Sequence, residues 1–385
     1  MPDSLLHSPD TLEFEVIIVT DLHGGNVYDH PGCLDFSANI HPLGMPDGVR
    51  RAICEAAMEA VQYPDPDCTD LRRAIAEKEK VLPDQVICGN GAADLIYLLC
   101  RACNGCKALV PQPSFTEYER ALTSSGWTVL SHFLDEKKEF CPDDSLAERI
   151  RMEKPDLVFL CNPNNPTGIL YPPELLQDIL EACKESGSRL AVDECFLDFV
   201  QPGKASSMVK QIDRFPGLFI LKAFTKNYGM PGVRLGYGIT SDPDLLERMR
   251  MNVQPWNVSL IAQKAGLAAL QDTAHIQKGC AIVEAERRLL SEALDGQGFI
   301  VCRGEANFIL FRTGSGLADL LKRRKTTLFG KLLEKGILIR DCSNFAGLCE
   351  GYYRIAVRTH EENRRFMEAL QEVVSDLKRG PAGIE

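Results

Sequence analysis

The stretch from Leu221 to Tyr237 reads LKAFTKNYGMPGVRLGY. Its glycines, its proline and its small residues predict a tight, irregular backbone path rather than a helix. Within it, Lys226 lies two positions after a phenylalanine and eight positions before Arg234. A lysine in such a pocket can act as an amine nucleophile and form a Schiff base with a carbonyl. The planar guanidinium of a nearby arginine can bind two oxygens of a phosphate.

An aldehyde and a phosphate occur together in pyridoxal phosphate. The lysine stretch alone leaves another interpretation open, because most lysines are solvated surface groups. A second stretch, VICGNGAADLIYLLC at residues 86–100, reads as a short strand, a glycine turn and a helix that begins at about Ala92. The N–H groups and the dipole of such a helix N-terminus can bind phosphate, although a Gly-Asn-Gly turn is also common where no ligand binds.

Polar residues follow two further apolar segments that read as buried strands. Asn162, Asn164 and Asn165 follow the strand in DLVFLCNPNNPTG, residues 156–168, and Asp193 ends the strand in RLAVDECF. Ligands bind at the carboxyl ends of strands in open α/β sheets. A carboxylate at the end of a buried strand is costly unless it is paired. The pyridinium nitrogen of pyridoxal phosphate would be such a partner, and its protonation maintains the electron sink.

Length and composition exclude several classes of protein. The chain has 385 residues and a net charge of −11, which argues against nucleic acid or an anionic membrane surface as a partner. No apolar run is long enough to span a membrane, and the short run FEVIIV near the N-terminus lacks the basic flank of a signal peptide. The fifteen cysteines have no disulfide-scaffold spacing and predict reduced thiols in a cytoplasmic protein.

Strand and helix patterns alternate from about residue 50 to 265, which predicts a parallel or mixed sheet covered on both faces. From about residue 266 a long amphipathic helix, several strands and a final helix predict a smaller α+β domain. We therefore expect an N-terminal arm and substrate loop at 1–46, a large domain at 47–265 and a small domain at 266–385. The first 20 residues would form a mobile or domain-packing arm.

A metal-binding alternative comes from Cys100, Cys103 and Cys106, whose spacing could ligate zinc or an iron–sulfur cluster. The run LIYLLCRAC is apolar at helical spacing, however, and no fourth ligand is adjacent. These cysteines are therefore interpreted as buried helix residues, and no metal site is predicted.

NPNNPTG, VDECF, FTK and GVRLGY, in this order, resemble the fold-type I pyridoxal-phosphate enzymes, the aspartate-aminotransferase superfamily. The likeness runs from about Gly24 to the final helix. It implies an α/β fold with a large, mixed, mostly parallel sheet domain and a smaller α+β C-terminal domain. Within the superfamily the chain is most similar to the threonine-phosphate decarboxylases of cobalamin synthesis, through HGGN, LDFSANIHPLGMP, QYPDPD and FTEYERAL, and next to the histidinol-phosphate aminotransferases.

The resemblance implies three catalytic residues. Lys226 would bond to the cofactor aldehyde and move protons at the substrate α-carbon, Asp193 would pair with the pyridine nitrogen, and Asn165 would bind the ring 3′-oxygen. The remaining cofactor contacts would come from Phe115, Thr225, Arg234, the backbone N–H groups of Gly91, Ala92 and Ala93, and Tyr63. Tyr63 would reach the cofactor phosphate of the neighbouring subunit, which implies a homodimer with shared active sites.

For the substrate, the resemblance implies that Arg354 binds the α-carboxylate, with Asn39 nearby. Arg340 is the candidate for a substrate phosphate, and His23 is a weaker one, because a lone histidine in a loop is more often structural. The expected reaction is decarboxylation of L-threonine O-3-phosphate to (R)-1-aminopropan-2-yl phosphate, with serine phosphate as a variant substrate. The alternative is a histidinol-phosphate-type aminotransferase, which could use the same lysine, aspartate and arginines.

Three positions depart from the usual pattern of the superfamily. Ala223 and Ala93 replace hydroxyl residues that often contact the cofactor phosphate. Each lost hydrogen bond is worth roughly 1 kcal/mol, so the backbone cradle and Arg234 should still hold the phosphate. Phe196 stands where aminotransferases usually have a tyrosine that donates to the 3′-oxygen. The decarboxylase branch also tends to have phenylalanine there, which favours decarboxylation.

Overall fold

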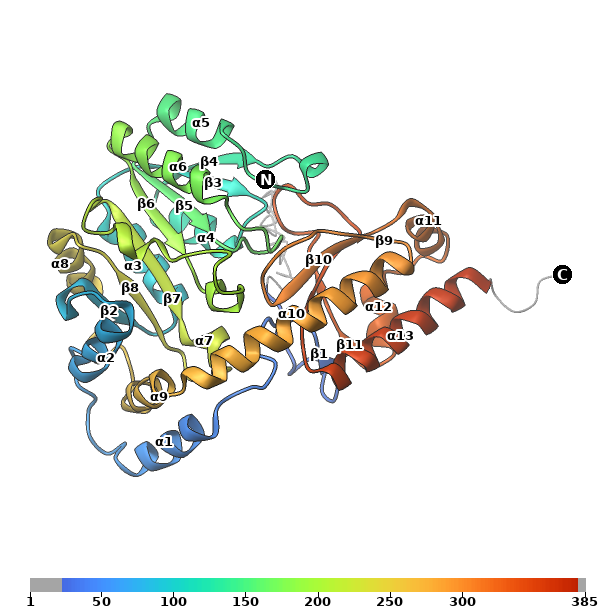
Figure 1. Cartoon of the computed structure of the whole chain (residues 1–385), viewed down its shortest axis with the longest axis horizontal. Coiled ribbons are helices and arrows are strands. Elements are labelled where there is room, and N and C mark those ends of the chain that lie inside the picture. Colours follow the sequence, from blue (N-terminus) through green and yellow to red (C-terminus); the bar gives the residue numbers. More distant parts are fainter. Residues whose placement is uncertain (1–22, 380–385) are drawn as a thin grey trace, which may run out of the picture.

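The computed structural model describes residues 23–379, so the arm predicted for residues 1–20 lies outside the described part. The largest sheet has seven strands in the order β2-β8-β7-β6-β5-β3-β4 (Figure 1). The strands are β2 (Val86–Gly89), β3 (Lys107–Gln112), β4 (Thr128–Phe133), β5 (Leu157–Cys161), β6 (Arg189–Asp193), β7 (Leu218–Ala223) and β8 (Gly236–Ile239). Strand β8 is antiparallel to both neighbours, and the strands from β7 to β4 are parallel. The sheet is therefore mixed and mostly parallel, as predicted.

Both faces of this sheet are buried, which explains why its central strands are almost continuously apolar. Along β5, Val158 and Leu160 belong to one core, whereas Leu157 and Phe159 belong to the other. The second core includes residues of α3 (Ala92–Ala102), α4 (Thr116–Ser124) and α8 (Pro243–Asn252). The first core includes residues of α1 (Asp47–Met58), α2 (Thr69–Glu79), α5 (Ser145–Glu153), α6 (Pro173–Ser186) and α9 (Leu260–Leu270).

A smaller antiparallel sheet has the order β12-β13-β10-β9. Its strands are β9 (Phe299–Val301), β10 (Phe308–Thr313), β12 (Arg340–Asp341) and β13 (Tyr352–Ala356). Its helices are α10 (Thr273–Gly296), α11 (Ser315–Arg323), α12 (Leu328–Leu333) and α13 (His360–Arg379). The long helix α10 contacts β9, β10 and α13 and also η3 (Leu197–Phe199), so it links the two sheets (Figure 1). The remaining 3-10 turns are η1 (Pro83–Gln85), η2 (Glu136–Lys138) and η4 (Met208–Gln211).

The α+β character predicted for the C-terminal part is confirmed, although the exact domain boundaries stay a prediction. Residues 336–342, GILIRDC, contain two short strands, β11 (Ile337–Leu338) and β12. Strand β11 pairs in parallel with β1 (Leu34–Asp35), which the sequence did not reveal. The two strands form a separate two-stranded sheet, and the backbone N–H of Ala356, at the end of β13, donates to the carbonyl of Phe36 at 2.8 Å, which holds the segment after His23 beside the small sheet.

The expectation of an irregular path rather than a helix at residues 221–237 was wrong at residues 224–227, and the two ends of the stretch belong to β7 and β8. After β7 the chain forms one helical turn, α7 (Phe224–Asn227), which carries Lys226. The turn is anchored by Phe224, which is buried and stacks on Tyr228 with ring centroids 5.5 Å apart. The path beyond it is irregular as expected: Gly229 has φ +58°, and a Cβ there would lie 2.4 Å from the backbone of Gly44.

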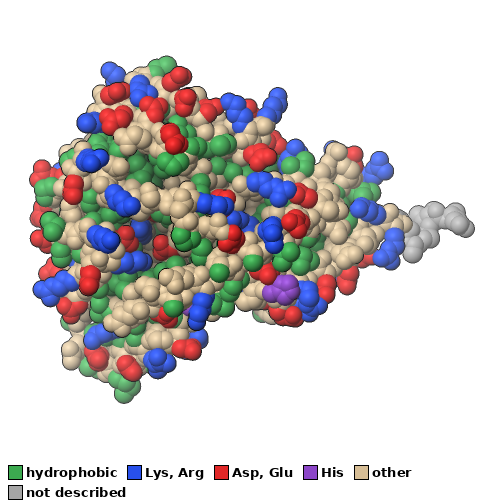
Figure 2. Space-filling view, in the orientation of Figure 1, with side chains coloured by type: hydrophobic (Ala, Val, Ile, Leu, Met, Phe, Trp, Pro, Cys, Tyr) green, Lys and Arg blue, Asp and Glu red, His purple; other side chains and the backbone are tan. Residues whose placement is uncertain are grey.

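None of the helices between residues 23 and 379 is long and apolar enough to cross a membrane. On the face drawn in Figure 2, the lysine and arginine side chains are interspersed with aspartate and glutamate. That face therefore presents no extended field of one sign.

Two stacked histidines, His41 and His275, hold in place the segment that follows Asn39 and passes beside Lys226. The ring centroids of His41 and His275 lie 3.9 Å apart, and the backbone N–H of His41 donates to the carbonyl of Lys226 at 3.1 Å. The Nδ1 atom of His41 accepts from Leu43 N–H at 3.2 Å, and its Nε2 lies 3.1 Å from the carbonyl of His275. The hydrogen bonds at both ring nitrogens therefore require neutral His41 with the proton on Nε2.

We expect the free energy of unfolding to fall in acid, because the hydrogen bonds of His41 require its neutral form. Burial first, and the neighbouring His275 second, lower the pKa of His41 from 6.5 to about 4. The unfolded chain therefore takes up this proton at a higher pH than the folded chain. The stability contributed by neutral His41 is complete above pH 6.5, and about 3 kcal/mol is lost as pH falls toward 4.

Urea unfolding of the wild type and of His41→Gln at pH 7 and pH 5 measures this effect. The gap between their unfolding free energies should shrink by about 2 kcal/mol at pH 5, since one pKa unit corresponds to about 1.4 kcal/mol. A gap that is the same at both pH values would contradict the assignment.

Candidate active site

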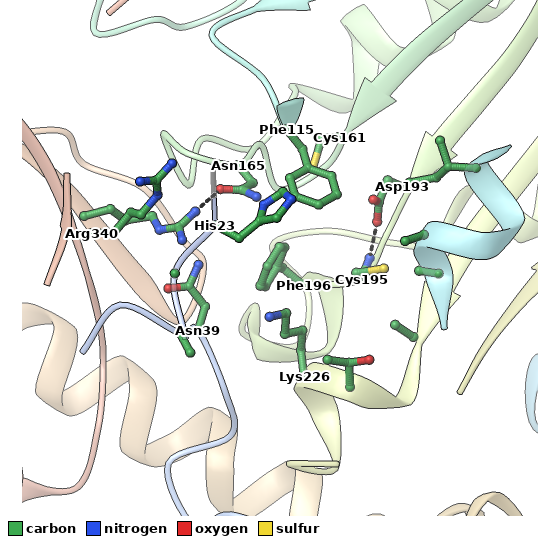
Figure 3. Close-up of a pocket in the computed structure, with 18 of the residues that line it drawn as sticks. His23, Asn39, Phe115, Cys161, Asn165, Asp193, Cys195, Phe196, Lys226 and Arg340 are labelled. Atoms are coloured by element: carbon green, nitrogen blue, oxygen red, sulfur yellow. Dashed lines mark hydrogen bonds between the residues drawn. The ribbon is translucent and has the colours of Figure 1, made fainter. Parts of the chain in front are cut away.

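A cavity of about 210 Å³ lies at the carboxyl ends of β5, β6 and β7 and faces the small sheet. Of the predicted site residues, the structure brings twelve to its wall: His23, Asn39, Ala92, Ala93, Phe115, Asn165, Asp193, Thr225, Lys226, Arg234, Arg340 and Arg354. Figure 3 shows several of them converging from both sheets and from the N-terminal segment. Gly91 and Tyr63 are the two predicted residues that do not line it.

Lys226 lines the cavity from α7, and its ammonium lies 6.0 Å from the centroid of the Phe196 ring. Loss of hydration first, and the positive charges of Arg354 and Arg234 after it, lower the pKa of Lys226 from 10.5 to about 8. Roughly a tenth of this amine is therefore neutral at pH 7, far more than at the ordinary pKa of a lysine. Only the neutral amine has the lone pair that can attack a carbonyl carbon.

Asp193 ends β6, and both of its carboxylate oxygens are held. Oδ1 accepts from the backbone N–H of Cys195 at 2.9 Å, and Oδ2 accepts from the hydroxyl of Tyr118 at 2.7 Å. Burial raises the pKa of Asp193, and these hydrogen bonds only partly offset it. A cation in the cavity, such as a pyridinium, would stabilise the ionised carboxylate.

Tyr118 is a site residue that the sequence reasoning missed. It is fully buried on α4, one helical turn after Phe115, and it stacks on Phe159 with centroids 4.9 Å apart. Its spacing from Phe115 was the available signal, because residues three apart on a helix share a face. The same face therefore presents one ring to the cavity and one hydroxyl to Asp193.

The N-terminus of α3 and Arg234 form an anion cradle. Gly91 precedes α3 with φ +87°, and a Cβ on it would lie 2.3 Å from a guanidinium nitrogen of Arg234. Gly236 has the same constraint, since its Cβ would lie 2.6 Å from the N of Ala92. Only glycines let the guanidinium and the helix N-terminus approach so closely. Both groups favour the same ligand, a phosphate.

Two buried arginines face the cavity from the small sheet. Arg340 and Arg354 are each 6% exposed and are directly opposite in the register of β12 and β13. Arg354 donates to Oδ1 of Asn165 and, at 3.3 Å, to the carbonyl of Ser37. Arg340 donates to Oδ1 of Asn344 at 2.8 Å.

Among the described residues, no carboxylate neutralises the positive charge of Arg354. No ion pair within residues 23–379 includes Arg354, and burial lowers its pKa to about 10. Its Nε and the Oδ1 of Asn39 are buried and have no hydrogen-bond partner among the described residues. A ligand with both an anionic group and a donor would satisfy them.

We expect Arg354→Gln to raise the KM for an amino-acid substrate about 100-fold or more. The variant loses the two-pronged contact to a carboxylate, and loss of one partner of a buried charge pair costs about 2–5 kcal/mol. Steady-state kinetics measures it. Arg312→Gln is the matched control, because Arg312 lies on β10 of the same sheet but pairs with Glu136 at 3.0 Å. Equal KM values for both variants would contradict a substrate role for Arg354.

The three departures from the superfamily pattern all lie in the cavity wall. Ala93, Ala223 and Phe196 line it, and the Phe196 ring packs edge-on against Phe308 with centroids 5.0 Å apart. Tyr63 lies elsewhere: it is 76% exposed and stacks on Trp256 at 4.3 Å. Its predicted role therefore depends on a second chain.

The cysteine cluster gives no support to the metal-binding alternative. Within residues 23–379, no group of three or more His, Cys, Asp or Glu side chains is placed to hold a metal ion. Cys100 and Cys103 are buried on and just after α3, whereas Cys106 is exposed. Burial raises the pKa of Cys100 to about 12 and that of Cys103 to about 11, which disfavours the thiolate needed for ligation.

Comparison with known proteins identifies the class to which this fold and site belong. Residues 31–370 match the family described as aminotransferase class I and II. The chain belongs to this family.

Two kinds of relative stand out within it. Threonine-phosphate decarboxylase of Salmonella typhimurium is 35% identical over 364 residues, which cover 92% of this chain and 97% of that protein. The solved histidinol-phosphate aminotransferase of Clostridium acetobutylicum is 33% identical, with a TM-score of 0.79 and coverage of 89% and 99%. L-threonine-O-3-phosphate decarboxylase of Porphyromonas gingivalis is 26% identical, with a TM-score of 0.73 and the same coverage.

Pyridoxal phosphate is the cofactor of this family, and the site fits it. The cradle at Gly91 and Arg234 suits its phosphate, the buried carboxylate of Asp193 suits its pyridinium, and the lowered pKa of Lys226 suits its aldehyde. When bound, this cofactor accepts the electron pair left by a bond that breaks at the substrate α-carbon.

Proposed function

We propose that this chain is a pyridoxal-phosphate-dependent decarboxylase that converts L-threonine O-3-phosphate to (R)-1-aminopropan-2-yl phosphate for cobalamin synthesis. L-Serine O-phosphate is a plausible variant substrate, because one methyl group is worth only about 1–3 kcal/mol of discrimination. The similarity to the Salmonella and Porphyromonas decarboxylases supports this choice of substrate.

One observation carries the proposal: two nearly buried guanidinium groups share a single cavity with Lys226. Like charges directly opposite on neighbouring strands are destabilising. A substrate with two anionic groups would relieve this repulsion, with its carboxylate on Arg354 and its phosphate on Arg340. An amino acid that carries a phosphate ester on its side chain has these two groups.

The side chains would then act by position. Arg354, Asn39 and Arg340 would hold the substrate and orient its bond from Cα to the carboxylate for cleavage. Carbon dioxide would then leave, and Lys226 would return a proton to Cα. Asn165 accepts from Arg354 through Oδ1, so its amide N–H groups would donate to the ring 3′-oxygen. Phe115 would stack on the ring.

A paired assay tests the function. Cofactor-loaded protein receives L-threonine O-3-phosphate without a keto acid in one tube, and histidinol phosphate with 2-oxoglutarate in the other. We expect carbon dioxide and an aminopropanol phosphate from the first tube alone. Glutamate from the second tube alone would overturn the proposal.

The second outcome would establish the alternative, an aminotransferase of the histidinol-phosphate type. The similarity to the Clostridium enzyme favours it, because this relative aligns with nearly the same share of the chain. The position of Phe196 favours the decarboxylase, since no tyrosine hydroxyl would then reach the 3′-oxygen from that residue.

We also propose that the working unit is a homodimer with shared active sites in the cytoplasm. Met58, Val61 and Tyr63 are exposed at and after the end of α1, where a second copy could cover them. All fifteen cysteines are free thiols, which fits a reducing compartment. Sedimentation at micromolar concentration should give twice the mass of one chain, and Tyr63→Ala should weaken cofactor retention; a monomer that retains its cofactor would refute the shared site.

A further inference from the structure

Glu117 is a nearly buried carboxylate that contacts His23, one of the residues lining the cavity. It lies on α4 two positions after Phe115, and its side chain is 10% exposed. Its Oε1 lies 2.9 Å from Nε2 of His23, and its Oε2 accepts from the hydroxyl of Tyr97 at 3.1 Å. Arg120, one turn further along α4, lies 3.4 Å from Oε1. Partners from two helices and from the N-terminal segment therefore fix this carboxylate.

His23 is the partner that faces the ligand. It lines the cavity together with Arg340, and Figure 3 shows its ring between Phe115 and Asn165. Its ring centroid lies 5.9 Å from that of Phe115. Because Nε2 bonds to Glu117, Nδ1 is the ring nitrogen that remains for a ligand. Burial normally disfavours an ionised carboxylate. The hydrogen bond from His23 nevertheless holds the pKa of Glu117 below its usual value, so Glu117 is the anionic acceptor of the pair and His23 is the donor.

We propose that Glu117 is a positioning residue: it holds Nε2 of His23 and so orients the ring with Nδ1 toward the phosphate ester of the substrate beside Arg340. This inference rests on the proposed function, because it assumes a phosphorylated amino acid. With the substrate bound, Nε2–H would donate to the carboxylate of Glu117 and Nδ1–H to the phosphate. Both acceptors are anionic, so both hydrogen bonds would be charge-assisted.

The test measures affinity with ligands that have no carboxylate to lose, so no turnover occurs during it. Titration of the cofactor absorbance of the holoenzyme gives a Kd for the proposed product, (R)-1-aminopropan-2-yl phosphate, and another for 1-aminopropan-2-ol, which lacks the phosphate. We expect Glu117→Gln to reduce the preference for the phosphorylated ligand about 10- to 100-fold and to leave the Kd for 1-aminopropan-2-ol unchanged. Glu119→Gln, an exposed neighbour on α4, is the matched control and should keep the wild-type preference.

A double-mutant cycle separates positioning from damage to α4. In a His23→Asn background, Glu117→Gln should cause no further loss of preference, because both changes remove one contact. Equal losses for both ligands would indicate a displaced Phe115 and would overturn the proposal, as would a wild-type preference that survives in Glu117→Gln. If the wild type itself shows no preference for the phosphorylated ligand, the proposed substrate class fails first, and the inference fails with it.

Discussion

Lys226→Ala is expected to reduce decarboxylation by about 10⁴-fold or more. The variant loses the nucleophile that bonds to the cofactor aldehyde and the group that moves a proton at the substrate α-carbon, and proton transfer alone contributes about 10²–10⁴-fold. The cradle at Gly91 and Arg234 and the carboxylate of Asp193 remain, so the cofactor should still bind without a covalent link. Borohydride reduction followed by peptide mass spectrometry should therefore add the cofactor mass to the wild type only.

Lys222, in the same stretch of sequence, is an internal control. It lies on β7, four residues before Lys226, and is nearly buried. Its ammonium lies 2.9 Å from a carboxylate oxygen of Glu79 and 3.5 Å from one of Glu194. Although burial opposes it, these two carboxylates raise the pKa of Lys222, which therefore stays cationic and cannot attack a carbonyl. Reduction that labels Lys222, or labels the Lys226→Ala variant equally, would show that Lys226 is not the nucleophile.

The sequence predicted the part of the site that is built from strand ends. Carboxyl ends of parallel strands meet at one edge of a sheet, so Asn165 after β5, Asp193 at the end of β6 and Lys226 after β7 had to lie close together. The resemblance then added Arg354 and Arg340 from a different sheet. All five residues line the cavity.

The remainder depended on contacts that no local pattern encodes. The pairing of β1 with β11 involves two residues from each strand, which is too short for any periodicity. Helix α7 is a single turn whose stability comes from the burial of Phe224 rather than from helix propensity. Glu117 reads on the sequence as a charged helix residue, and only the fold brings His23, 94 positions away, against it.

Asp193→Asn should reduce decarboxylation by about 10²–10⁴-fold while the protein stays folded and binds the cofactor phosphate. Asparagine has nearly the same shape but no charge, so nothing would stabilise the protonated pyridine nitrogen and the electron sink would weaken. Its amide also cannot accept from both Tyr118 and the N–H of Cys195, which now bond to one oxygen each. The measurement is kcat together with the cofactor absorbance of the purified variant.

Tyr118→Phe is the control for this prediction, and we expect it to lower kcat less than Asp193→Asn does. It removes one donor, at 2.7 Å from Asp193, and leaves the negative charge in place. A hydrogen bond to a charged group is worth about 1.5–3 kcal/mol, so we expect a loss of about 10- to 100-fold, smaller than for Asp193→Asn. Because burial raises the pKa of Asp193 and the Tyr118 hydroxyl opposes that rise, the acidic limb of the kcat profile should move to higher pH in Tyr118→Phe. Asp193→Asn with kcat within tenfold of the wild type would mean that the charge at the pyridine nitrogen is not what drives the reaction.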